Sequence, residues 1–206
     1  MTFELRYWRR GLVTITGLAA AVAIVGCQPQ TPLDNYGATP SFNLTDQSGA
    51  TFSSQSLAGH VTLLDFIYTN CTDACPIMSA TFQDAARKLA QDNLLGSKVM
   101  LVSLSVDPVH DIPPVMADYA QEFKADPNSW KMLTGDFDSV YDVITGFKVA
   151  TRPPRPAADS PAPGGTELTH TTAVMLIDPQ LQVRAILDGT NASADDLISA
   201  AKRLIK

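Results

Sequence analysis

The residues with the greatest capacity for chemistry lie in one short stretch, Asn70-Cys71-Thr72-Asp73-Ala74-Cys75-Pro76. Two of the three cysteines in the 206-residue chain, Cys71 and Cys75, are four positions apart here. Residues at i and i+4 share one face of a helix, with Cβ atoms roughly 5–6 Å apart. Two sulfurs placed in this way can close a disulfide or bind one metal ion.

Four kinds of chemistry are open to this pair. A structural disulfide would close a very small loop, which gains little chain entropy. A redox pair usually has two intervening residues, whereas three separate these cysteines. Zinc sites usually have three or four protein ligands, and the sequence offers no second cysteine pair. Copper(I) favours thiolates and accepts few ligands, so two thiolates and one imidazole would form a trigonal copper site.

A third ligand for such a site must come from the three histidines of the chain, His60, His110 and His170. His170 is favoured because it follows a proline-rich segment and precedes an expected strand. His110 lies in the turn after a buried strand and is the second choice. Asp107, in the same turn as His110, is a candidate to orient the imidazole of His170, as carboxylates beside metal-bound histidines do. His60 is expected to be an ordinary surface residue.

The cysteine stretch lies between an expected strand and an expected helix. Residues 61–68 form a near-continuous apolar run, as in a central strand that is covered on both faces. After Pro76, which a first helical turn tolerates, apolar residues at helical spacing predict an amphipathic helix to about Asn93. These apolar residues are Met78, Phe82, Ala85, Ala86 and Leu89, and Met78 is expected to pack in the core. Cys71 then lies near the helix start, where free N–H groups lower a thiol pKa.

Strands and helices alternate through the rest of the chain. Strands are expected at 99–106, 130–133, 172–177 and 182–187, helices at 112–123, 137–145 and after Ser193, and a β-hairpin between 41 and 52. This order predicts an α/β domain, with a central mixed sheet flanked by helices and an N-terminal β-hairpin. Residues 152–165 include five prolines and two glycines and are expected to form a loop.

The N-terminal residues 1–26 are typical of an export signal. Three arginines precede an apolar run over 11–26, which is shorter than the roughly 20 residues that span a bilayer comfortably. Ile24-Val25-Gly26-Cys27 resembles a bacterial lipobox, which predicts cleavage before Cys27 and a lipid on that cysteine. An uncleaved membrane anchor is the alternative, and in both cases the domain is exported and tethered. Residues 27–40 then form a linker, and 41–206 form the domain.

Lipid on Cys27 would leave one cysteine pair, which removes the anomaly of an odd cysteine count in an exported chain. Cleavage would also remove three arginines and one glutamate, leaving 12 basic and 20 acidic residues and a formal charge of −8. No basic run follows Arg10. A nucleic acid is therefore not an expected partner.

Several segments together resemble the Sco/SenC family. They are Phe42 with Asp46 and Gly49, the run 64–69, the Cys71-xxx-Cys75-Pro76 motif, Ser105-Val106-Asp107-Pro108, and a later histidine before Ile177-Asp178-Pro179. The resemblance covers roughly residues 38–205, in the family's order.

The resemblance implies a thioredoxin-like fold and a copper site whose ligands are Cys71, Cys75 and His170. It further implies a metallochaperone, a thiol reductant or both, acting on the binuclear copper centre of cytochrome c oxidase subunit II, with a thiol reductant as a further possible partner. The chain departs from the family in having Thr169 before its histidine, where an aspartate is usual, and His110 near a usual arginine. Its segment before His170 is also longer or looser than is usual.

Two other functions stay open at this point. A thiol–disulfide oxidoreductase or thiol peroxidase would use Cys71 as the attacking thiolate and Cys75 as the resolving thiol, with no need for His170 or a metal. A copper-sensing member of the same fold has the same sequence features as the chaperone. The expected place of all three is a bacterial membrane, facing the periplasm or the outer side.

Overall fold

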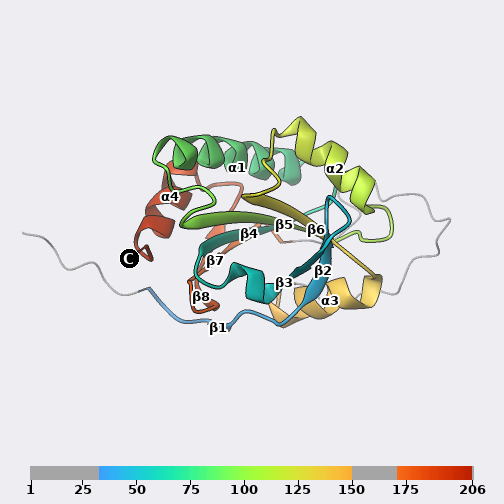
Figure 1. The fold of residues 1–206 in the computed structure, drawn as a ribbon, viewed down its shortest axis with the longest axis horizontal. Coiled ribbons are helices and arrows are strands. Elements are labelled where there is room, and N and C mark those ends of the chain that lie inside the picture. The colour runs from blue at the N-terminus through green and yellow to red at the C-terminus, as the bar shows by residue number, and fades with distance from the viewer. Residues whose placement is uncertain (1–32, 150–170, 206) are drawn as a thin grey trace, which may run out of the picture. The chain divides into compact units, whose positions relative to one another are not determined.

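An eight-stranded mixed sheet forms the centre of the domain (Figure 1) in the computed structural model, which describes residues 33–149 and 171–205. The strands are β1 (Gly37–Ala38), β2 (Asn43–Asp46), β3 (Thr51–Ser53), β4 (Val61–Ile67), β5 (Val99–Ser105), β6 (Trp130–Thr134), β7 (Ala173–Ile177) and β8 (Gln182–Asp188). The helices are α1 (Ala74–Gln91), α2 (Pro113–Glu122), α3 (Phe137–Gly146) and α4 (Ala194–Lys202), with a 3-10 turn, η1, at Ser54–Leu57. None of these helices is long and apolar enough to cross a membrane.

The strands lie in the order β1-β8-β7-β4-β5-β6-β2-β3. The central strands β4, β5 and β6 are parallel, and β7 and β2 pair antiparallel on either side of them. Every residue of β4 and β5 is buried, because α1 and α2 cover one face of the sheet and α3 covers the other (Figure 1). This arrangement explains why these two strands are apolar throughout instead of alternating. The predicted mixed α/β sheet is confirmed.

Local sequence signals account for most of the boundaries. The predicted N-terminal hairpin is present as β2 and β3. Helix α4 begins with the expected capping box, in which the Ser193 side chain accepts from the Asp196 N–H and the Asp196 carboxylate accepts from the Ser193 N–H. Both prolines of α2 lie in its first turn, where a backbone N–H has no helical partner.

The expected linker 27–40 requires a correction within the described residues. Gly37 and Ala38 form β1, which pairs antiparallel with Val183 and Gln182 of β8. A strand of two residues is too short to produce a hydrophobic period, so no pattern in the sequence indicates it. The folded domain therefore begins before residue 37 and not at residue 41.

Candidate metal centre

The two cysteines lie where β4 passes into α1. Cys71 is in the connecting loop and Cys75 is in the first turn of the helix, both buried as free thiols. The backbone N–H of Cys75 points to the Cys71 sulfur, with 3.4 Å between nitrogen and sulfur. The two residues therefore lie next to each other, but Cys71 precedes the helix, which begins at Ala74.

The two thiols have opposite acidities. Burial acts to raise the pKa of Cys71, whereas the hydrogen bond that the Cys75 thiol donates to the Cys71 sulfur acts to lower it. The backbone N–H groups of Asp73 and Cys75 and the Tyr68 hydroxyl contribute further, so the pKa of Cys71 is lowered. Burial, assisted by the neighbouring Cys71, raises the pKa of Cys75 far above that of an ordinary thiol. Cys71 is therefore the thiolate-forming member of the pair.

The loop before Cys71 is held by a buried carboxylate on another segment. Asp111, 1 % exposed, accepts hydrogen bonds from the Thr69 hydroxyl (2.5 Å) and the Thr69 backbone N–H (3.3 Å). Its other oxygen accepts from the Ser105 hydroxyl at the end of β5 (2.5 Å). Asp111 thus joins the ends of two parallel strands directly beneath the cysteine loop. No spacing in the sequence indicates this role.

A second buried carboxyl lies below α1. Asp65 of β4 is fully buried, and neither of its oxygens makes a hydrogen bond with good geometry within the described residues. Burial, only partly offset by the neighbouring Ser103 hydroxyl, raises the pKa of Asp65 to about 7. Its charge also acts on Cys75. One signal for Asp65 was visible in the sequence, since it is the acidic residue within an otherwise apolar strand.

Neither described histidine forms a metal-binding group with the two thiols. The His110 Nδ1 lies 2.8 Å from both carboxylate oxygens of Asp107. The predicted partner of Asp107 was His170, so that pairing stays a prediction. His60 precedes β4, about 20 Å from the end of that strand at roughly 3.3 Å per residue. Over residues 33–149 and 171–205, no three histidine, cysteine, aspartate or glutamate side chains are grouped to hold a metal. The predicted residues Cys27, Thr169 and His170, and the predicted loop 152–165, lie outside the described residues.

The chain re-enters the described structure beside the cysteines. Strand β7 runs antiparallel to β4 and begins at the end of the sheet where β4 finishes. Gly189 makes this contact close, because a Cβ there would lie 2.9 Å from both the Met78 Cε and the Thr172 carbonyl oxygen. Met78 is 1 % exposed, so its predicted role in the core is confirmed. Thr172 is therefore packed beside the first turns of α1.

The profile of the SCO1/SenC family matches residues 30–206. The chain belongs to this family. The fold is accordingly the thioredoxin-like fold of Sco proteins, and the predicted family and fold class are both confirmed.

Three solved structures are similar over most of their length. A SCO1/SenC family lipoprotein from Bacillus anthracis has a TM-score of 0.70 and 29 % identity, covering 85 % of this chain and 98 % of that one. BsSco, described with a disulfide switch and as a member of the Sco family of cytochrome c oxidase assembly proteins, has a TM-score of 0.68 and 29 % identity, covering 84 % and 96 %. Bradyrhizobium japonicum ScoI, solved with copper bound, has a TM-score of 0.67 and 28 % identity, covering 82 % and 99 %.

Proposed function

We propose that this protein is a membrane-anchored copper metallochaperone that takes part in cytochrome c oxidase assembly. The observation that carries the proposal is the pair of adjacent buried free thiols at the start of α1, Cys71 in the preceding loop and Cys75 in the first turn. A similar protein with copper bound and a similar cytochrome c oxidase assembly protein support it. The proposed acceptor is the binuclear copper site of cytochrome c oxidase subunit II.

The proposed ligands for the copper cargo are the two thiolates and His170. His170 is one residue before Thr171, where the described chain resumes, and Thr172 packs beside the first turns of α1. This position of Thr172 supports His170 as the proposed third ligand. Two thiolates and an imidazole form a soft donor set, which suits copper(I) better than harder metals.

The unequal thiols define how the pair would load copper. Cys71, with its lowered pKa, is the first to offer a thiolate, whereas Cys75 gives up its proton only as the metal binds. Because binding releases thiol protons, apparent copper affinity should rise with pH. Oxidation by a disulfide would transfer two electrons and two protons to that oxidant and join the sulfurs of Cys71 and Cys75. Copper loading would thereby depend on the redox state and on a thiol reductant partner.

Membrane attachment is part of the same proposal. Residues 1–26 would act as a lipoprotein signal, and Cys27 would carry the lipid that holds the domain at the periplasmic or outer face of a bacterial membrane. The similarity to a family lipoprotein supports this attachment.

The decisive experiment measures copper(I) affinity of the full-length reduced protein by competition with a chromophoric chelator. We expect the single substitutions Cys71→Ser, Cys75→Ser and His170→Ala each to lower affinity by at least about 100-fold, because loss of a ligand should cost more than the roughly 10–100-fold that loss of an outer-shell partner costs. His60→Ala is the matched control, because His60 lies at the other end of β4, and it should leave affinity unchanged. Equal affinity in all four variants would refute the proposed site.

A thiol–disulfide oxidoreductase or thiol peroxidase is the second candidate. The favouring observation is the acidity difference, because a low-pKa Cys71 beside a high-pKa Cys75 suits an attacking and a resolving thiol. Turnover of a disulfide or peroxide substrate that survives His170→Ala but not Cys71→Ser would support this function over copper delivery.

A further inference from the structure

Two large apolar side chains are exposed beside the cysteines. Within the described residues, four large apolar side chains are about half exposed, and two of these are Ile77 (51 %) and Ile112 (49 %). Ile77 lies in the first turn of α1, two residues after Cys75. Ile112 directly follows Asp111, whose carboxylate holds Thr69 just before the cysteine loop. Both isoleucines are therefore close to the start of α1.

A buried hydrogen bond between α1 and α2 fixes the relative position of these two segments. The Ser79 and Tyr119 hydroxyls lie 2.8 Å apart. Cys75 precedes Ser79 by one helical turn on the same face of α1, and Ile112 precedes Tyr119 by about two turns. Cys75 and Ile112 therefore lie at the same end of the helix pair, where both helices begin (Figure 1).

The surface around both isoleucines has few charges and a fixed backbone. Residues 70–77 and 108–115 contain no lysine, arginine or glutamate, although 17 % of the chain is charged. Their exposed acidic residue is Asp73, since Asp111 is buried. Prolines adjoin the two isoleucines, and their fixed φ means that little conformational entropy is lost when a partner covers them. The isoleucine surface, as we define it, comprises Pro76, Ile77, Ile112, Pro113 and Pro114.

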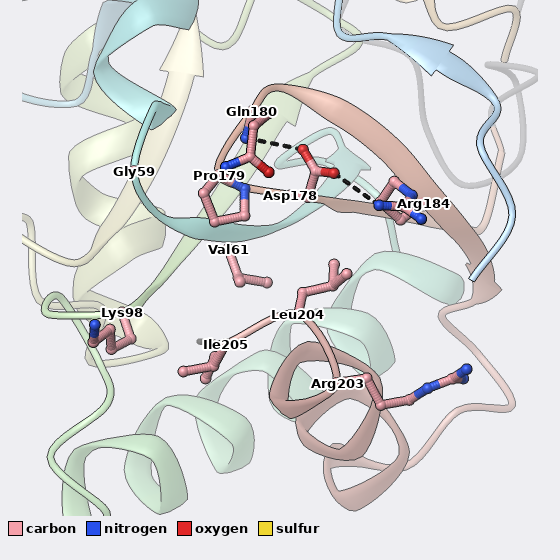
Figure 2. A pocket seen from close by; sticks show the side chains of 10 residues that line it. All are labelled: Gly59, Val61, Lys98, Asp178, Pro179, Gln180, Arg184, Arg203, Leu204 and Ile205. Atoms are coloured by element: carbon pink, nitrogen blue, oxygen red, sulfur yellow. Dashed lines mark hydrogen bonds and ion pairs between the residues drawn. The ribbon is translucent and has the colours of Figure 1, made fainter. Parts of the chain in front are cut away.

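The opposite end of the sheet has a charged surface instead. A pocket of about 340 Å³ lies there, where β4 begins, and Lys98 and Arg184 are among its lining residues (Figure 2). Arg184 is paired with Asp178, with 3.0 Å between Nη1 and Oδ2 (Figure 2). An apolar partner that covered these groups would take charges out of water, which is costly. Such a partner is therefore favoured at the cysteine end.

We infer that the isoleucine surface is where the copper acceptor docks, through an apolar contact beside the thiols. This inference rests on the copper delivery proposed above. Both cysteines are buried, so an acceptor can take copper(I) only while it touches the surface next to them. In the exchange, each bond from copper(I) to an acceptor ligand forms as a bond to Cys71 or Cys75 breaks. The oxidation state does not change, and the released thiolates take up protons from solvent.

The size of the surface favours a transient acceptor over a second copy of this chain. A stable complex buries roughly 800 Å² on each partner, and two half-exposed isoleucines with three prolines offer far less than that. Small interfaces are typical of transient encounters, which suits an acceptor that must leave with the metal. A permanent dimer on this face would also cover the thiols and block the exchange.

The test measures binding of the copper-loaded full-length protein, in detergent micelles, to the copper-free copper domain of cytochrome c oxidase subunit II from the same organism. Ile77→Gln introduces a good helix former and Ile112→Ser a good N-cap, so neither should disturb the fold. We expect each substitution to weaken binding about fivefold, and both together about 25-fold, because apolar burial is lost. Ile186→Thr is the matched control, because Ile186 is 47 % exposed on β8, which β7 separates from β4.

Unchanged binding in the double variant, an equal loss in Ile186→Thr, or no binding of the unsubstituted protein would overturn the inference. Copper affinity and copper transfer to the same domain are measured alongside, and copper affinity should be the same in the isoleucine variants. Weaker binding in those variants, with no copper transfer from the unsubstituted protein, would refute the proposed delivery alone. Transfer that is equally fast from the unsubstituted protein and the double variant would refute the docking surface alone.

Discussion

Removal of the Asp111 side chain should destabilise the domain more than any exposed substitution. Asp111→Ala leaves the Thr69 hydroxyl, the Thr69 N–H and the Ser105 hydroxyl without their acceptor. Each buried donor left unpaired costs about 1–3 kcal/mol. Part of that cost is offset because a buried carboxylate is also removed. We expect a net loss of about 3 kcal/mol in the free energy of unfolding.

Urea denaturation at neutral pH measures this loss, with an unchanged denaturant slope indicating that the folded state stays compact. Asp118→Ala on the exposed side of α2 is the matched control and should change stability by less than about 0.5 kcal/mol. Asp111→Asn keeps one acceptor oxygen and should lose about half as much as Asp111→Ala. Cys71, two residues after Thr69, should also react faster with a thiol reagent. A stability loss in Asp111→Ala as small as that in the control would refute the anchoring role.

Three further predictions concern the same domain. Burial raises the pKa of Asp65 to about 7, against about 3.9 in the unfolded chain. Between these two values the folded carboxyl keeps its proton while the unfolded one has lost it. The free energy of unfolding therefore falls progressively as pH rises from about 4 to about 7. Urea titrations should show about 4 kcal/mol of stability lost over that interval, and Asp65→Asn should flatten the dependence. Gly189→Ala would place a Cβ 2.9 Å from both the Met78 Cε and the Thr172 carbonyl oxygen, so thermal unfolding should register a loss of about 1–3 kcal/mol. The same substitution should cost less when it is made in a Met78→Ala background than in the original chain. Ser193→Ala removes the cap of α4 and should lower stability by about 1 kcal/mol in the same assay, whereas an equal loss at an exposed mid-helix serine would argue against capping.

The sequence predicts those parts of the domain that depend on local patterns. The apolar runs of β4 and β5, the helical period after Pro76 and the capping box at Ser193 each carry their own signal, and the structure has all of them within one or two residues. The proximity of Cys71 to Cys75 was predictable for the same reason, since three intervening residues at a helix start keep the two side chains close, although Cys71 lies in the loop before α1.

Contacts between distant segments were not predictable in this way. Asp111 reaches Thr69 across 42 positions, and Arg184 reaches Leu33 across 151. Such pairs depend on the order of strands in the sheet, which the sequence does not encode locally. For the same reason β1 was placed in the linker, because its two residues become a strand only when β8 lies beside them.

The lengths of the two outermost strands have a consequence if the protein is held at a membrane as proposed. The described sheet ends in β1 and β3, which have two and three residues, whereas β4, β5 and β8 have seven. An exposed sheet edge can pair with the edge of another molecule and begin aggregation. Tethered proteins collide often, because they are confined to two dimensions. Within the described residues β1 pairs only with Gln182 and Val183 of β8, so the rest of β8 forms a longer open edge. If the domain is tethered as proposed, this part of β8 is where a neighbouring copy would pair first.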